Sequence, residues 1–466
     1  MHLAPDNTGL WGIQQTEDAA RTVSALLQED MEKHHCFFNF QGFHNHIPHH
    51  LLALYGTGAR PSSLHAAYKR NESYQRSTLP QHTPKDPSQA SSEPLFLTPF
   101  PAAALERGYL SNEAYYPDFL RFFQGEIGRS IREGKDWRKE VVTKYLFNED
   151  EMLARLFAGF LHPAIQLMCG LEWYRNQEPI VAEALAQTAV HSFETAGPYL
   201  MSAEKAASSQ KPSNGSWSIL GLLGSIRNNK ALTHSAHNED ENKIRDGVLK
   251  RAGDQMIHLA SQVKVRPEEV EERTAEMFNA AVFVAAAAAV AQEGKQPKFD
   301  FFLMHHVTSG PLFATLSTAN WISPETKARI LEWKIRMDLL QYVARGCPEL
   351  SLKKLQAYRS RKPEAGSQSL PDIIARLHNF PDDGHAIKLG RAAVVCRNLC
   401  KKYEESNTSD RLPIKGDDVW AKVCYLIVDS VEAPGPHWVR STGFEEAWKV
   451  GYNNSSGLGW YGTMLI

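Results

Sequence analysis

The sequence lacks several features that would indicate a special class of protein. It has only six cysteines in 466 residues and no Cys-x-x-Cys pair, so neither a disulfide framework nor a zinc ribbon is indicated. Its longest apolar run, AAVFVAAAAAVA over 280–291, is well short of the roughly 20 residues that a membrane-spanning helix needs. This run indicates a buried helix instead. Because the N-terminus shows no basic segment followed by an apolar one, we expect a cytoplasmic protein.

An excess of charge of either sign is also lacking. Lysine and arginine number 51 against 53 acidic residues, which gives a net charge of −2 with neutral histidines. Such a balance creates no general field that would attract nucleic acid or an anionic membrane, and we expect neither partner. The shares of hydrophobic residues (42%) and charged residues (22%) are typical of a folded globular protein.

Fingerprints of nucleotide binding and of common hydrolases are missing as well. Gly56 and Gly58 follow a helical pattern and lack the third glycine of a dinucleotide-binding turn. No Walker A sequence, Gly-x-Ser-x-Gly or His-Glu-x-x-His is present. The sequence therefore argues against a serine hydrolase, and also against a flavin or a nicotinamide nucleotide held by this chain.

Helical periodicity dominates what is present. Apolar residues recur at helical spacing over long segments such as 16–33 and 266–292, whereas strand-like alternation is almost absent. The sequence predicts a mainly α fold, in which residues 1–466 form a large single-domain antiparallel helical assembly with few or no strands. Two segments interrupt the pattern. One is a proline-rich crossover over 78–101, and the other is a polar insertion over 201–242, the best candidate in the chain for a disordered segment.

Histidine is the one enriched residue type, with 19 copies. Some of them gather in four segments of helical character, which are HNHIPHH over 44–50, FLHPAIQL over 160–167, HHVTSGP over 305–311 and DGHAIKLGRA over 383–392. In the last segment, His385 and Lys388 stand three positions apart and share one helix face. A lone histidine on an apolar helix is more often a hydrogen-bonded core residue than a metal ligand, and a lysine there ordinarily snorkels to solvent. Each segment alone is thus a weak signal.

Taken in this order, the four segments resemble the questin oxidase-like family, and the resemblance extends from about residue 30 to residue 450. Fungal members of that family act in pathways to anthraquinone-derived polyketides, which are secondary metabolites. The resemblance implies an oxidoreductase that uses dioxygen to open the central quinone ring of an anthraquinone or reduced anthraquinone. The product would be a benzophenone, and the partner of the protein would be a small aromatic polyketide.

The resemblance also implies a metal centre. Related ring-cleaving dioxygenases are non-haem iron proteins in which several histidines and a carboxylated lysine hold Fe²⁺. Carried over residue by residue, the ligands and catalytic residues would be His46, His162, His305, His385 and Lys388. Lysine is normally a cation that would repel the metal, whereas the carbamate formed by addition of carbon dioxide is an anionic oxygen donor. Lys388 is therefore expected in carboxylated form.

Some alternatives stay open. In the first segment, His44, His49 or His50 could take the place of His46, and in the third segment His306 could take the place of His305. A second function is a metal-independent or NADPH-assisted Baeyer–Villiger oxidase, whose histidines would act as acid and base. A third is a non-catalytic polyketide-binding protein, in which the histidines only satisfy hydrogen bonds in a helical core.

Overall fold

The structure is a computed structural model. It describes residues 1–82, 100–101, 104–105, 108–173, 178–209, 217–362, 368–406 and 408–449. In these ranges the chain forms helices joined by turns, and its β pairing is limited to three isolated bridges. The prediction of a mainly α fold with few or no strands is confirmed. The chain divides into two compact units, Met1–Pro198 with Thr318–Thr326, and Tyr199–Ser317 with Lys327–Ile466. That both form one domain, as the sequence predicts, stays a prediction.

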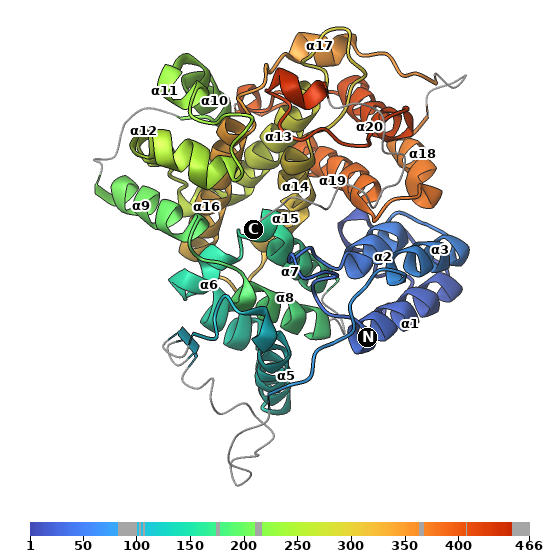
Figure 1. The fold of residues 1–466 in the computed structure, drawn as a ribbon. Coiled ribbons are helices and arrows are strands. Elements are labelled where there is room, and N and C mark those ends of the chain that lie inside the picture. The colour runs from blue at the N-terminus through green and yellow to red at the C-terminus, as the bar shows by residue number, and fades with distance from the viewer. Residues whose placement is uncertain are drawn as a thin grey trace. The chain divides into compact units, whose positions relative to one another are not determined.

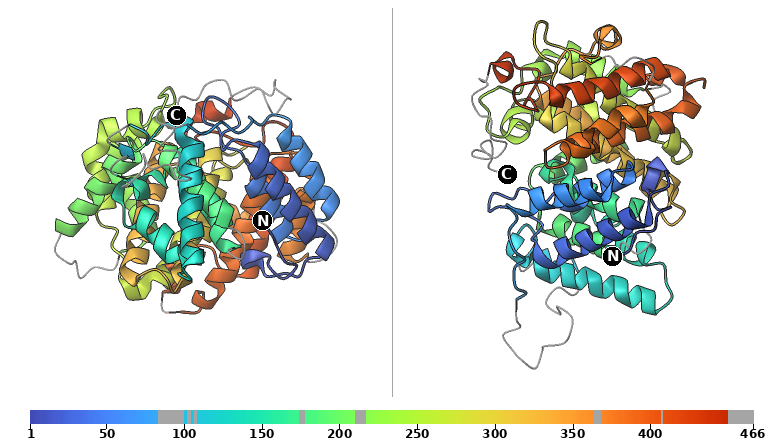
Figure 2. Two further views of the ribbon diagram at one scale, coloured as in Figure 1. Left: turned by 90° about the horizontal axis from the view of Figure 1, so that it is seen from below. Right: turned by 90° about the vertical axis from the view of Figure 1, so that its right-hand side faces the viewer.

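The first unit carries the first two histidine segments. Its helices are α1 (Glu17–Lys33), α2 (Ile47–Gly56), α3 (Pro61–Glu72), α5 (Tyr116–Arg132), a π-helix (Arg138–Phe147), α6 (Asp150–Arg155), α7 (His162–Glu172) and α8 (Glu178–Val190). Helices α1, α2 and α3 pack on one another and appear in blue (Figures 1 and 2). Helix α8 packs against both α5 and α7, and α2 also contacts α7. The starts of α2 and α7, where two of the predicted ligands stand, therefore belong to packed helices.

Helix α1 shows how local sequence sets these elements. Thr16 is its N-cap residue and accepts a hydrogen bond from the Ala19 N–H at 3.1 Å. Glu17 and Asp18 follow in the first turn, where negative charge stabilises the helix dipole. The apolar side chains at helical spacing are buried, as Val23 illustrates. The helix predicted over 16–33 is confirmed.

The second unit carries the third and fourth histidine segments. Its helices are α9 (Ala196–Ser209), α10 (Ile219–Asn228), α11 (Lys230–Thr233), a π-helix (Lys243–Leu249), α12 (Lys250–Ala260), α13 (Val270–Ala289), α14 (Phe301–Thr308), α15 (Gly310–Thr318), α16 (Pro324–Ala344), α17 (Leu352–Ala357), α18 (Leu370–Ala375), α19 (His385–Cys400) and α20 (Asp417–Glu432). Three of these helices, α9, α15 and α16, begin or end with residues that belong to the first unit. Helix α13 is buried along most of its length and packs against α14 and α19 (Figure 1). The alanine-rich run lies largely in α13, as expected of a buried helix. In the described part of the chain, no helix is both long and apolar enough to cross a membrane.

The two interrupting segments have different outcomes. Most of the predicted crossover, residues 83–99, lies outside the described residues, as do 210–216 of the predicted insertion over 201–242. The rest of that insertion differs from expectation, because α9 continues to Ser209 and α10 and α11 follow. Ser218 and Asn229 cap these two helices by accepting backbone N–H groups. Serine and asparagine mark both loops and helix starts, which explains the difference.

Candidate metal centre

The first histidine pair lies where α2 and α7 begin. His46 is the N-cap residue of α2, and His162 is the first residue of α7. Their Nε2 atoms are 2.9 Å apart, and both side chains are buried. The Nδ1 atom of His162 lies 2.7 Å from the carbonyl oxygen of Gly159, which accepts its N–H. In the neutral ring this leaves the lone pair of His162 on Nε2, directed toward His46.

The residue before His46 fixes the entry into α2. The Asn45 side chain donates from Nδ2 to Asp30 at 2.9 Å and accepts the Ile47 N–H through Oδ1, also at 2.9 Å. Asp30 also bonds to His34 Nδ1 at 2.8 Å. Burial raises the pKa of Asp30, while the hydrogen bonds from His34 and Asn45 oppose that rise. His46 is thus held by neighbours that are themselves anchored to α1.

Sequence reasoning missed one histidine, His191, which lies next to this pair through its contact with His44. The ring of His44 stacks on that of His162 with centroids 4.0 Å apart, and His44 Nε2 lies 2.8 Å from His191 Nε2. His191 donates from Nδ1 to the Gln187 carbonyl at 2.6 Å, and burial lowers its pKa to about 4. His191 is therefore neutral at neutral pH. It directly follows the last residue of α8 and has no motif around it, so no sequence signal could have found it.

The other two histidines of the first segment have different partners. His50 Nδ1 lies 3.0 Å from the side-chain amide nitrogen of Asn71 on α3. His49 Nε2 lies 2.6 Å from Gln166 Oε1, and the Gln166 amide in turn donates to Glu183 at 3.0 Å. These contacts favour His46 over His49 and His50 as the residue whose Nε2 atom faces His162.

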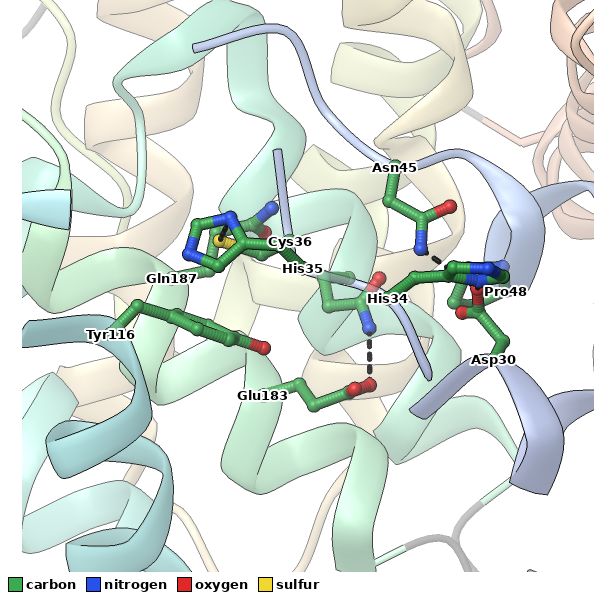
Figure 3. A pocket seen from close by; sticks show the side chains of 10 residues that line it. Asp30, His34, His35, Cys36, Asn45, Pro48, Tyr116, Glu183 and Gln187 are labelled. Atoms are coloured by element: carbon green, nitrogen blue, oxygen red, sulfur yellow. Dashed lines mark hydrogen bonds and ion pairs between the residues drawn. The ribbon is translucent and has the colours of Figure 1, made fainter. Parts of the chain in front are cut away.

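Gln166 and Glu183 line a polar cavity within the first unit (Figure 3). The residues around it are Asp30, His34, His35, Cys36, Asn45, Pro48, Tyr116, Gln166, Glu183 and Gln187. Burial, with a contribution from the charge of Asp30, raises the pKa of Glu183 to about 8. Burial also raises the pKa of Cys36 and that of Tyr116 well above their ordinary values. Glu183, Cys36 and Tyr116 are therefore mainly uncharged at neutral pH.

The second histidine pair lies in the second unit. His305 stands on α14 and His385 is the first residue of α19, and these helices pack together. The two Nε2 atoms are 3.2 Å apart. His305 donates from Nδ1 to the Phe301 carbonyl at 2.6 Å, and His385 donates from Nδ1 to Asp383 at 2.5 Å. When both rings are neutral, two lone pairs face each other, an arrangement that a cation between them would stabilise.

Lys388 follows His385 by one helical turn and is buried, with 5% of its surface exposed. Before it, Asp382 caps α19 by accepting the Gly384 N–H at 2.9 Å and the Ala386 N–H at 2.8 Å. Burial and the adjacent charge of Asp383 raise the pKa of Asp382 to about 7, against a smaller opposing effect of Lys388. The start of α19 therefore gathers a histidine, a lysine and two carboxyl groups.

His306 has a separate environment. Its Nδ1 atom lies 2.5 Å from Asp338, and the same carboxyl oxygen accepts a hydrogen bond from Lys334 at 2.5 Å. Lys334 is fully buried and also donates to the His306 carbonyl at 3.2 Å. This ion cluster ties α14 to α16 and favours His305 as the histidine that faces His385.

The structure thus places the five predicted residues in two groups. His46 and His162 form one group in the first unit, and His305, His385 and Lys388 form the other in the second unit. All five side chains are buried. Imidazole nitrogens and a carbamate oxygen are a donor set that suits Fe²⁺, so the residues present fit the expected metal.

Comparisons with known proteins define the class. The chain is 33% identical to the Baeyer–Villiger monooxygenase dmxR6 of Cryptosporiopsis sp., over 96% of this chain and 97% of the relative. It is 34% identical to the oxidoreductase AflY of Aspergillus parasiticus, over 94% and 85%, and 32% identical to the questin oxidase of Aspergillus fumigatus, over 93% and 94%. The protein is an oxidoreductase. Residues 43–393 match the questin oxidase-like family, and the chain belongs to that family, as its four histidine segments predict.

Proposed function

We propose that this protein is a non-haem iron-dependent oxygenase that uses O₂ to cleave the central quinone ring of an anthraquinone or reduced anthraquinone. The product is a benzophenone-type compound of fungal polyketide secondary metabolism. The observation that carries the proposal is the pair of Nε2 atoms of His305 and His385, which face each other with both Nδ1 atoms engaged. The relatives named questin oxidase and Baeyer–Villiger oxidase support it, because a Baeyer–Villiger oxidation breaks a carbon–carbon bond beside a carbonyl group.

The ligands are His46, His162, His305, His385 and Lys388. Nitrogens that would bind one ion must lie within a few ångströms of each other, because metal–nitrogen distances are about 2.0–2.1 Å. The observed separations within the two pairs, 2.9 Å and 3.2 Å, agree with that expectation. The Nδ1 bonds of His162, His305 and His385 direct Nε2 of each ring toward its partner histidine.

Lys388 contributes the anionic ligand. Carbon dioxide adds to the neutral amine at Nζ, a carbon–nitrogen bond forms, and one proton is released, so that the side chain ends in a carbamate. Without this step, four neutral imidazoles would leave the ion at its full double charge. The position of Lys388 one turn after His385 allows both side chains to serve one ion from the same helix face.

Aromatic side chains beside the second pair suit a flat substrate. Phe301 contacts the rings of His305 and His385 edge to face, with centroids 4.8 Å and 5.1 Å apart. Trp438 meets the His385 ring in the same manner at 6.2 Å. In the proposed reaction, these rings pack against the polyketide and exclude water. When bound, iron supplies the one-electron chemistry that lets O₂ react with an electron-rich organic ring.

Metal analysis tests the proposal. We expect about one iron per chain in untagged wild type, and clearly less in His385→Ala and in Lys388→Ala. His237→Ala, which changes an exposed histidine of the same unit, is the matched control and retains the iron. Oxygen uptake with an anaerobically reduced anthraquinone should follow the iron content. Wild type that binds no iron after anaerobic ferrous reconstitution would refute the proposal.

The relatives' names favour one alternative, a metal-independent or NADPH-assisted Baeyer–Villiger oxidase in which buried histidines act as acid and base. The two mechanisms differ in their dependence on metal. Under the alternative, thoroughly iron-free protein consumes oxygen with the substrate as fast as the reconstituted protein does. Under our proposal, oxygen uptake depends on added Fe²⁺.

A further inference from the structure

Asp300 joins a segment near the end of the described chain, residues 439–442, to the start of α14. It is the N-cap residue of that helix, and its Oδ1 atom accepts the N–H groups of Phe302 at 2.8 Å and of Leu303 at 3.1 Å. Its other oxygen, Oδ2, accepts the N–H group of Thr442 at 2.7 Å. The side chain is fully buried, so these hydrogen bonds compensate for its removal from water. One carboxyl group therefore serves both as a helix cap and as a tie to the segment 439–442.

Backbone pairing holds the same segment along the start of α14. Phe301 donates its N–H to the Val439 carbonyl at 2.8 Å, and Val439 donates its N–H to the Phe299 carbonyl at 3.0 Å. These two bonds form a short parallel bridge. The Arg440 guanidinium lies over the Phe301 ring, 5.4 Å from its centroid. Phe301 is thus held at its backbone by Val439 and at its ring by Arg440.

Phe301 connects this segment to the second histidine pair. Its carbonyl oxygen accepts the Nδ1 hydrogen of His305 at 2.6 Å, which leaves the lone pair of the neutral imidazole on Nε2. Its ring packs edge to face against those of His305 and His385, with centroids 4.8 Å and 5.1 Å apart. A displacement of Phe301 would therefore change both the hydrogen bond that sets the tautomer of His305 and the packing of the two imidazoles.

We propose that Asp300 is a positioning residue of the metal centre, which acts through Phe301 to direct Nε2 of His305 toward the ion. The inference rests on the proposed function, because that function makes His305 a metal ligand. Loss of a group that orients a ligating histidine typically lowers metal affinity by about 10- to 100-fold. Because Asp300 acts through another residue, we expect an effect at the lower end of this range.

Two substitutions separate the cap from the tie. Asp300→Ala removes both. Asp300→Asn keeps a good N-cap residue, because its amide oxygen still accepts from the first turn of α14, but its NH₂ group then faces the N–H of Thr442 and cannot accept from it. If the tie positions His305, Asp300→Asn should behave like Asp300→Ala. If Asp300 only caps the helix, Asp300→Asn should behave like wild type.

Two readouts are measured on each full-length variant. Anaerobic titration with Fe²⁺ against a competing chelator should give Asp300→Asn an affinity roughly tenfold below that of wild type. In metal-free protein that carries nitrogen-15 histidine, NMR should show His305 with its hydrogen on Nδ1 in wild type and as a mixture of tautomers in Asp300→Asn. The spectrum of His305→Ala identifies the signal. This second readout needs no metal, so it tests the role of Asp300 separately from the proposed function.

Asn229→Ala is the matched control. Asn229 is the N-cap residue of α11 in the same unit and also accepts two backbone N–H groups, from Ala231 at 3.0 Å and from Leu232 at 3.3 Å. Its loss removes a comparable cap, and both readouts should stay as in wild type. An unchanged His305 tautomer in Asp300→Asn would overturn the positioning role, as would an equal loss of Fe²⁺ affinity in Asn229→Ala. Wild type without iron would refute the proposed function instead, and the tautomer of His305 would still decide the role of Asp300.

Discussion

His305 and His385 face each other through Nε2 atoms 3.2 Å apart, and each donates its Nδ1 hydrogen to an oxygen atom of the second unit. For His305 that oxygen is the backbone carbonyl of Phe301, whereas for His385 it is the side chain of Asp383. A backbone carbonyl is not removed by mutation, but a carboxylate is. Asp383 is therefore the group through which the orientation of the pair can be tested.

Asp383→Ala should weaken iron binding without removing a ligand. Loss of the carboxylate frees the His385 ring to rotate and to change tautomer, and we expect the affinity for Fe²⁺ to fall roughly 10- to 100-fold. Anaerobic titration with Fe²⁺ against a competing chelator measures this. Asp410→Ala, at an exposed carboxylate of the same unit, is the control. An affinity equal to that of wild type would show that Asp383 does not orient a metal ligand.

Gly159→Ala should destabilise the protein more than an ordinary substitution of glycine. Gly159 has a φ of 52°, and a Cβ there would overlap the imidazole of His191. Gly12 has a φ of 70° but open space around its Cβ, so Gly12→Ala carries only the backbone strain of about 1 kcal/mol. We expect Gly159→Ala to lower the free energy of unfolding by about 1–3 kcal/mol beyond that, as overpacking does. Urea denaturation of both variants measures the difference. Equal losses of unfolding free energy in the two variants would mean that the His191 ring moves aside without destabilising the protein.

Much of the fold and part of the site could be predicted from the sequence. Helix α1 and the buried helix α13 follow from apolar periodicity, and the four histidine segments follow from local motifs. His191 and Glu183 could not be predicted in this way. Both stand on or beside α8, an almost wholly buried helix, and they acquire a role only because α8 packs against α7. Such roles depend on tertiary contacts that leave no pattern along the chain.

The local order of the histidines shows the same limit. By spacing alone, His46 and His50 share a helix face, and the motif does not distinguish among the histidines of the first segment. In the structure, His46 is the N-cap residue and meets His162, whereas His50 turns to Asn71 on α3. Which histidine meets His162 is decided by the packing of α2 against both α3 and α7, and the sequence of α2 alone does not reveal that packing.

If Lys388 is a carbamate, iron binding should depend on carbon dioxide. Metal-free wild type prepared in degassed, bicarbonate-free buffer should take up markedly less Fe²⁺ than the same protein supplied with bicarbonate. Carbon-13 bicarbonate should give a carbamate signal by NMR in a diamagnetic Zn²⁺-loaded sample. Lys388→Ala should show neither the bicarbonate effect nor the signal, and Lys354→Ala, at a lysine of the same unit that is paired with acidic residues, should show both. Iron uptake by wild type that ignores bicarbonate would contradict the carboxylated lysine.

Glu183 should make the stability of the protein fall as pH rises. Burial and the charge of Asp30 raise the pKa of Glu183 from 4.5 to about 8 in the folded state. Between these two values the folded state binds more protons than the unfolded state does. By linkage, the contribution of this residue to the free energy of unfolding declines by up to about 1.4 kcal/mol per pH unit across that window.

The variant Glu183→Gln removes this titration and leaves an uncharged amide of nearly the same size. We therefore expect its Tm to exceed that of wild type by an increasing margin from about pH 5 to about pH 8, and the margin to level off above about pH 8. The comparison isolates Glu183 because Asp30, His35, Cys36 and Tyr116, which line the same cavity, are present in both proteins. A margin that stays constant with pH would mean that Glu183 ionises in the folded protein as it does in the unfolded chain. In that event the carboxylate would be solvated or paired rather than buried as a neutral acid.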